Sequence, residues 1–319
     1  MSTWLEALSW RSHVAIRAKT QRAIELLRDQ GLQGLVRALW YKWRHPLRCG
    51  AVPQHRYKLL GNVQGNVLLV DAADTGIGRE LALYAVHEPI TTRLIAGFVC
   101  PGECVIDLGA NIGYYCLMLA RLVGPQGKVL AIEPHPHNFH VLQTNLLLNR
   151  VANVECLQAA VSDRSGVATL YVSSASNWHT LNPTRAQDSL QVEVPTITLD
   201  ELTERLPHPP QLIRMDTEGF EARILDGGRR LLGTQKPRLI IEVHPAYLGQ
   251  KYGPAMLRQL LDWGYECRFV VLRADDRPWQ RKRHQVREIP LRILADEPTL
   301  FRTREAFTVF LEKATPKSN

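Results

Sequence analysis

The 319-residue chain has no run of about 18 consecutive apolar residues, the length that a membrane-spanning helix needs. It has no CxxC pair either, and its six cysteines are scattered along the chain. These absences argue against a transmembrane protein, a cysteine-based zinc site and a disulfide framework. We therefore expect reduced, mostly buried thiols and a cytoplasmic location.

A GxGxxG motif is also missing. This argues against a redox dinucleotide site, because such a site binds its pyrophosphate at that glycine turn. No internal repeat or low-complexity segment occurs, and the hydrophobic content of 45% and charged content of 22% are ordinary for a globular protein. The length allows one large domain with an appendage.

The net charge of +8 is uneven along the chain. Residues 1–50 hold nine Lys/Arg against three acidic residues and so carry +6 of it, which leaves the rest nearly neutral. Nothing in the main domain therefore indicates a nucleic-acid partner.

Residues 1–50 are expected to form a basic helical extension, followed by the main domain at 51–319. Within the extension, large apolar residues recur at helical spacing and form one face. They are Leu32, Leu35, Val36, Leu39, Trp40 and Trp43. This face would pack on the main domain or on a second copy of the chain in a homodimer; the alternative is a weak contact with a membrane surface.

The main domain alternates strand and helix patterns after a hairpin at 57–71. Strands are expected at 104–108, 128–134, 154–161, 167–172, 212–216, 238–244, 266–272 and 307–313, and helices at 87–99, 112–123, 138–149, 220–232 and 256–264. Near-continuous apolar strands alternating with helices predict an α/β, Rossmann-like fold. Its sheet would have seven mostly parallel strands with helices on both faces, and the last two strands would form an antiparallel edge hairpin.

The stretch CVIDLGANIGYY joins the first of these strands to a helix through a glycine turn. Ligands of open α/β sheets bind outside the carboxyl ends of the strands. Gly109 allows a sharp turn there, and Gly113 lets the helix begin close to a ligand. The acid at Asp107 suits a cationic group, such as the ammonium of an amino acid, better than a pyrophosphate.

Two further acids stand at the ends of the next strands. Glu133 ends the second strand, where a carboxylate can accept hydrogen bonds from both hydroxyls of a ribose. Ser162 and Asp163 end the third, where they suit the exocyclic amine of an adenine. Amino acid, ribose and adenine in this order are the parts of S-adenosylmethionine.

Four blocks of the sequence extend this interpretation: PGECVIDLGANIGYY, GKVLAIEPHPHNFHVLQTNLLLN, LIRMDTEGFEARILDGG and PRLIIEVHP. With the shorter blocks HEP, NVECLQAAVSD and PTITLDEL they resemble the FkbM-type family of S-adenosylmethionine-dependent methyltransferases. The resemblance covers about residues 57–250, and it implies O-methylation, often of sugars or polyketide-type metabolites. The long basic N-terminal region, Thr217 and a basic insertion at 277–287 depart from the family pattern and leave the acceptor open.

The expected cofactor site comprises residues around these strand ends. They are Glu88, Asp107, Gly109, Ala110, Asn111, Gly113, Tyr114, Glu133, Pro134, Ser162, Asp163 and Asp216. Methylation of an alcohol also needs a group that takes its proton, and acids and histidines at strand ends are the candidates. They are Asp216, Glu218, Glu242 and His244.

For the acceptor, a small molecule or glycan, the candidates are His179, Glu218 and Glu221. A metal site made of Asp216, Glu218, Glu242 and His244 is conceivable, since other methyltransferases use Mg²⁺ to orient diols, but the spacing is generic and no metal is expected. Two other functions are alternatives: a non-catalytic cofactor-binding or scaffold protein of the same fold, and an NAD-dependent oxidoreductase.

Overall fold

The computed structural model describes residues 56–173, 175–183, 190–278, 286–297, 299–302 and 305–314. The expected N-terminal extension at 1–50 lies outside these residues, as does most of the 277–287 insertion. Among the described residues, no helix combines the length and the apolar character that crossing a membrane requires. The five cysteines in this part of the chain are unpaired, and Cys104 and Cys116 are the buried ones.

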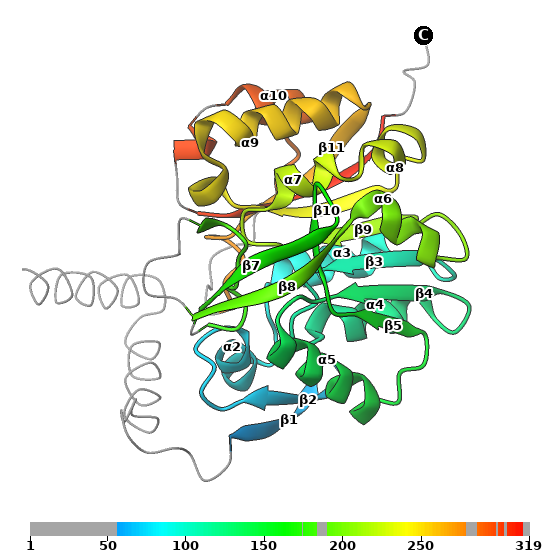
Figure 1. The fold of residues 1–319 in the computed structure, drawn as a ribbon, viewed down its shortest axis with the longest axis vertical. Helices are drawn as coiled ribbons and strands as arrows, with labels where there is room; N and C mark the ends of the chain where they lie inside the picture. Colours follow the sequence, from blue (N-terminus) through cyan, green and yellow to red (C-terminus); the bar gives the residue numbers. More distant parts are fainter. Residues whose placement is uncertain are drawn as a thin grey trace, which may run out of the picture. The chain divides into compact units, whose positions relative to one another are not determined.

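Seven strands of the described chain form the central sheet (Figure 1). In spatial order they are β11 (Tyr265–Leu272), β12 (Phe307–Lys313), β10 (Arg238–Val243), β9 (Leu212–Met215), β3 (Cys104–Leu108), β4 (Lys128–Ile132) and β5 (Val154–Leu157). Every pair from β10 to β5 is parallel, whereas β12 runs antiparallel to both of its neighbours. The predicted mostly parallel, seven-stranded sheet is confirmed, with β12 inserted between β10 and the edge strand β11.

Helices cover both faces of this sheet (Figure 1). One face carries α2 (Ile77–Tyr84), α3 (Pro89–Phe98), α4 (Tyr114–Val123), α5 (Pro136–Leu148) and the hairpin of β1 (Tyr57–Val63) and β2 (Asn66–Asp71). The other carries α6 (Leu199–Leu202), η2 (Thr203–Arg205), α7 (Glu221–Asp226), α8 (Arg229–Thr234), α9 (Pro245–Asp262), α10 (Leu291–Asp296) and η3 (Leu300–Arg302). Successive strand residues point to opposite faces, so Val105 joins the first core and Ile106 the second.

The strand expected at 154–161 is wrong in its length. It breaks after β5, and the chain continues as β6 (Ala160–Ser162) in a second sheet with β8 (Leu190–Thr198) and β7 (Gly166–Val172). The helix expected at 220–232 also divides, into α7 and α8. A Cβ at Gly227, between these two helices, would lie 2.1 Å from the Ser162 carbonyl oxygen, so only glycine allows the chain to pass this close to β6.

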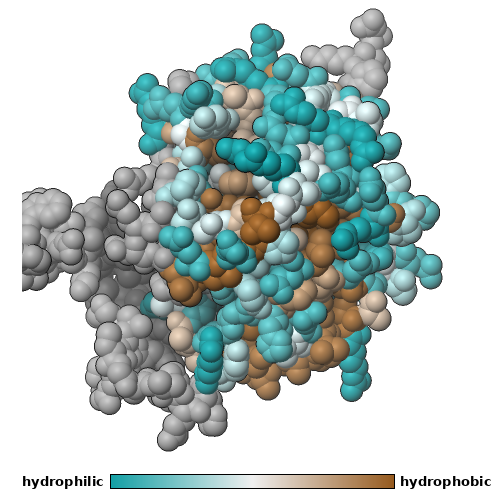
Figure 2. Space-filling view, in the orientation of Figure 1, coloured by the Kyte–Doolittle hydropathy of each residue, from teal (hydrophilic) through white to brown (hydrophobic). Residues whose placement is uncertain are grey.

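The face of the molecule in Figure 2 mixes hydrophilic and hydrophobic residues. Among the residues that the structure describes, the most exposed large apolar side chains are Leu147 of α5, at 78%, and Val167 and Leu190 of the small sheet, each at 70%. Val167 and Leu190 stand at opposite ends of the β7–β8 pairing. Separate apolar side chains of this kind are normal on a protein surface and identify no interface.

Candidate functional site

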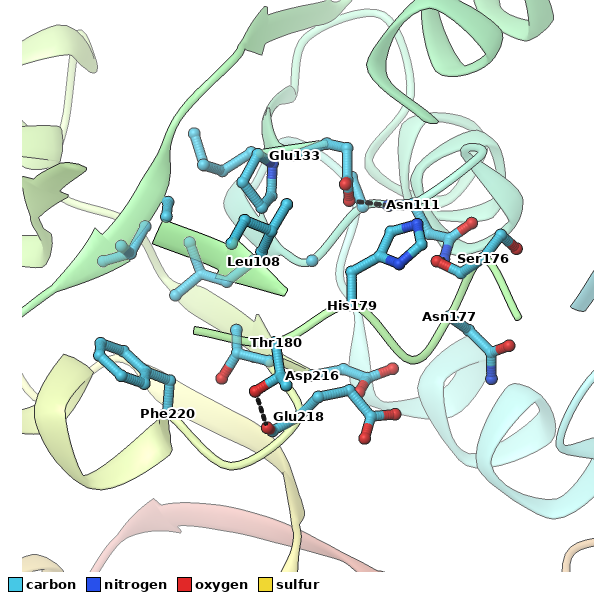
Figure 3. A pocket seen from close by; sticks show the side chains of 18 of the residues that line it. Leu108, Asn111, Glu133, Ser176, Asn177, His179, Thr180, Asp216, Glu218 and Phe220 are labelled. Carbon is cyan, nitrogen blue, oxygen red and sulfur yellow. Dashed lines mark hydrogen bonds between the residues drawn. The ribbon is translucent and has the colours of Figure 1, made fainter. Parts of the chain in front are cut away.

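A pocket opens at the carboxyl ends of three neighbouring strands, β3, β4 and β9 (Figure 3). Its walls come from 108–111 after β3, 132–134 after β4 and 214–218 at the end of β9. Residues 176–181, from the connection between β7 and β8, close another side. This is the place where open α/β sheets bind ligands. Of the predicted residues, the lining includes Gly109, Ala110, Asn111, Tyr114, Glu133, Pro134, His179, Asp216 and Glu218.

Glu133 is held at the end of β4 by backbone donors. Its carboxylate accepts hydrogen bonds from the Asn111 N–H at 2.8 Å and the His135 N–H at 2.9 Å. Only 4% of the residue is exposed. Burial raises the pKa of Glu133 to about 7, and the two backbone donors oppose that rise. A carboxylate has about four acceptor positions, so Glu133 can still accept a hydrogen bond from a donor in the pocket.

The glycine turn after β3 positions Asp216. Gly109 has φ +78°, and a Cβ on it would lie 2.0 Å from the Asp216 carbonyl oxygen. Only glycine allows the two strand ends to approach this closely. Gly113 serves packing instead: a Cβ there would lie 2.8 Å from the Leu142 side chain of α5, and Gly113 is not in the pocket wall.

Asp107 is buried behind the wall, with no exposed surface. Its Oδ1 accepts a hydrogen bond from the Arg214 Nη1 at 2.9 Å, while Arg214 Nη2 donates to Asp216 Oδ2 at 2.9 Å. The guanidinium also lies 4.0 Å from the centre of the Tyr115 ring. Burial raises the pKa of Asp107 despite this cation. Asp107 therefore does not line the pocket, where it could contact a ligand ammonium directly. Arg214 lines the pocket instead, and it was not among the residues predicted from the sequence.

Three other predicted cofactor residues lie outside the lining. Glu88 is buried and accepts a hydrogen bond from the Tyr115 hydroxyl at 2.6 Å, and its carboxylate also pairs with Arg273. Ser162 donates to Asp163 at 2.8 Å, and the other oxygen of Asp163 accepts from Arg223 at 2.9 Å. The pocket lining also contains apolar residues, among them Pro134, Ala159, Ala160, Val161, Leu170 and Phe220.

His179 reaches the pocket from the connection between β7 and β8 (Figure 3). Its Nδ1 accepts the Ser173 N–H at 3.0 Å, and its ring centre lies 4.2 Å from that of His135. Burial lowers the pKa of His179 to about 3, helped by His135, so the ring is neutral at pH 7. The adjoining Ser176 carbonyl accepts the side-chain amides of Asn111 and Asn138, each at 2.9 Å. These bonds tie the connection to the pocket.

An imidazole surrounded by carboxyl groups lies beside the pocket. The His244 Nδ1 lies 2.8 Å from Glu221 Oε1. Its Nε2 lies 3.6 Å from Glu218, 3.9 Å from Asp216 and 4.0 Å from Glu242. Asp216 and Glu218 line the pocket, whereas Glu221, Glu242 and His244 stand behind them.

The pKa values of His244 and Glu242 are shifted both by burial and by the charges of the neighbouring residues. Burial alone would lower the pKa of His244, but Glu218 and Glu221 outweigh it and raise that pKa well above the usual value. Burial, with Asp216 next, raises the pKa of Glu242 well above its ordinary value. At neutral pH this arrangement holds a protonated imidazole, which cannot accept a further proton. The carboxylates at the pocket are therefore better proton acceptors than His244.

Comparison with known proteins identifies the family. A model of the Methyltransferase FkbM domain matches residues 107–267, about half of the chain. The chain belongs to the FkbM methyltransferase family. This family of S-adenosylmethionine-dependent methyltransferases agrees with the resemblance seen in the sequence.

Individual methyltransferases are also similar to this chain. The 31-O-demethyl-FK506 methyltransferase FkbM of Streptomyces tacrolimicus is 45% identical over 67 residues, which is 21% of this chain and 25% of that protein. Methyltransferase sdnD of Sordaria araneosa is 42% identical over 67 residues, 21% of this chain and 26% of that protein. A methyltransferase FkbM of known structure from Methylobacillus flagellatus has a TM-score of 0.40 at 18% identity, and covers 65% of this chain and 43% of that one. The chain thus spans less than half the length of these relatives.

Proposed function

We propose that this FkbM methyltransferase transfers a methyl group to a hydroxyl of a small metabolite, sugar or glycan. The observation that carries the proposal is that one pocket is lined both by Glu133, fixed by two backbone donors, and by the carboxyl groups of Asp216 and Glu218. The first suits the sugar of the cofactor, and the other two suit an alcohol that must lose its proton.

The pocket residues fit S-adenosylmethionine in their chemistry. Glu133 would accept hydrogen bonds from the ribose hydroxyls. The apolar residues of the pocket lining, among them Pro134 and Phe220, would pack on the adenine. The cofactor, when bound, supplies an electrophilic methyl group. The chain itself contributes alignment of the acceptor and removal of its proton.

Glu218 is the proposed proton acceptor. Asp216 already accepts a charge-assisted hydrogen bond from Arg214, so one of its carboxylate oxygens is engaged. Glu218 lies at a constrained turn: its φ is +52°, and its carbonyl oxygen accepts a 2.6 Å hydrogen bond from the Thr180 hydroxyl. Held in this conformation, its side chain lines the pocket, and the His244 ring lies 3.6 Å from its carboxyl group. A proton taken up by Glu218 would thus remain among Asp216, Glu218, Glu242 and His244.

Labelled cofactor tests the reaction type. The full-length protein is incubated with S-adenosylmethionine bearing a trideuterated methyl group and with pools of hydroxylated metabolites, sugars and glycans. The proposal predicts products heavier by one labelled methyl whose NMR shift is that of an O-methyl group. Labelled products carrying the methyl on nitrogen or carbon would contradict it, and so would tight cofactor binding with no turnover on any pool.

The affinity for S-adenosylmethionine should rise with pH between 6 and 8. With a pKa of about 7, Glu133 is protonated below that value and a carboxylate above it. Only the carboxylate accepts from both ribose hydroxyls, and its fraction rises about tenfold from pH 6 to pH 8. Calorimetry across this range should show an affinity gain of about tenfold. The Glu133→Gln variant, which cannot ionise, is the control; an equal gain in that variant would assign the titration to another group.

A further inference from the structure

We propose that Asp216, Glu218 and His244 form a binding site for a divalent cation of the Mn²⁺ type. One ligand atom from each of the three residues lies within 4.8 Å of the others. Figure 3 shows the carboxyl groups of Asp216 and Glu218 side by side after β9. One cation can therefore contact all three residues at once, at the edge of the pocket.

Behind the pocket, the His244 Nε2 and the Glu242 carboxyl group meet each other and their neighbours only at distances longer than a hydrogen bond. His244 is 7% exposed, yet its Nε2 has no hydrogen-bond partner in the described chain, and its three nearest carboxyl groups stand at 3.6–4.0 Å. Glu242 is 9% exposed, and within the same residues its carboxyl group has no hydrogen bond and faces Nε2. Buried polar groups normally have partners, so these two residues leave a polar gap that a cation would fill.

Glu221 orients the imidazole as metal sites require. It is fully buried, and its Oε1 lies 2.8 Å from His244 Nδ1 and accepts the Gly219 N–H at 2.9 Å. Histidine ligands commonly donate one ring N–H to a carboxylate, which turns the other nitrogen toward the metal. Here that other nitrogen, Nε2, faces Asp216 and Glu218. A cation would replace a proton on Nε2, because a ligating imidazole is neutral.

The donor set selects the kind of ion. Carboxylate oxygens suit Mg²⁺, Ca²⁺ and Mn²⁺, whereas imidazole suits transition metals, so two carboxylates with one imidazole favour Mn²⁺ over Mg²⁺. If the proposed O-methylation holds, the ion would also bind the acceptor oxygen and lower the pKa of its hydroxyl. Cation binding itself does not depend on the reaction proposed above.

Metal binding can be measured without turnover. Full-length protein is stripped with a chelator and titrated with MnCl₂, while free Mn²⁺ is followed by its EPR signal; calorimetry with S-adenosylmethionine is run in parallel. We expect one saturable Mn²⁺ site. Glu221→Gln should weaken it about 10- to 100-fold, as loss of an orienting partner does. His244→Ala and Glu218→Gln should weaken it at least as much.

Asp163→Asn is the matched control, because Asp163 is an acid at another strand end that pairs with Arg223. It should leave Mn²⁺ affinity unchanged. Glu218 lies at the pocket, so Glu218→Gln still tests the site if the substitutions at the buried Glu221 and His244 unfold the protein. The absence of saturable binding by the wild type, or binding that none of the three substitutions weakens, would overturn the site. Either result can occur with intact cofactor binding and O-methyl products, so a failed metal site is distinguishable from a failed reaction proposal.

Discussion

Glu133→Ala should reduce the affinity for S-adenosylmethionine by at least about a hundredfold. Two hydrogen bonds to a charged acceptor are lost, and each contributes about 1.5–3 kcal/mol. The substitution also removes the acceptor of the Asn111 and His135 N–H groups, which then lose their partner at the pocket wall. Titration calorimetry on the purified full-length protein gives the dissociation constant directly.

Asp163→Asn is the comparison that gives this result its meaning. Both residues are acids that follow a strand, but the Asp163 carboxylate accepts hydrogen bonds from Ser162 and Arg223 and does not line the pocket. The Asp163→Asn variant should bind the cofactor with a dissociation constant within about threefold of wild type. This change is far smaller than the one that the loss of a charged hydrogen bond causes. A Glu133→Ala variant that also stays within that range would remove Glu133 from the cofactor site.

Glu218→Gln should lower kcat by about a hundredfold or more, the usual contribution of a positioned proton acceptor. Glutamine keeps the size of the side chain but cannot take the proton. Because Glu218 is not expected to contact the ribose, the dissociation constant of the cofactor should be unchanged. The measurement is steady-state turnover on the acceptor found with labelled cofactor, together with calorimetry.

Glu204→Gln provides the control, since Glu204 is an exposed acid of η2 that faces Arg230 across 3.7 Å. Its kcat should match wild type. Normal turnover in Glu218→Gln would place the proton acceptor elsewhere, with Asp216 next. The Glu221→Gln variant separates a lost proton acceptor from a lost cation, because Glu221 does not line the pocket.

The sequence predicted the sheet because its parallel strands are buried on both faces. Strands such as β3 and β9 are buried at every position and are apolar apart from Asp107 and Arg214. Mostly apolar strands of this kind are typical of the interior of an α/β fold. The break between β5 and β6 left no such signal. It depends on β6 pairing with β8, a partner 36 residues along the chain from Ala160 to Thr196.

The site was predictable where a strand end alone fixes it. Glu133, Asp216 and Glu218 follow strands and line the pocket for that reason. The environment of Asp107 was not predictable, because it depends on Arg214, 107 residues away on the adjacent strand. An arginine between the apolar residues Ile213 and Met215 was the available signal, since a buried cation needs acidic partners.

Residues 176–181 show a different limit. Ser176 and Thr180 reach the pocket through hydrogen bonds to Asn138 and Glu218, which lie 38 residues away in opposite directions along the chain. A connection held by such bonds has no hydrophobic periodicity from which its position could be predicted. The same is true of the position of Glu221 beside His244.

The most direct test of the account is a crystal structure of the full-length protein with S-adenosylhomocysteine, the demethylated cofactor. The account predicts that the ribose hydroxyls lie within hydrogen-bonding distance of the Glu133 carboxylate, with the adenine against Pro134 and Phe220. The sulfur would then be on the side of the pocket that Asp216 and Glu218 line. A ligand bound outside this pocket, with Glu133 still contacting only Asn111 and His135, would contradict it.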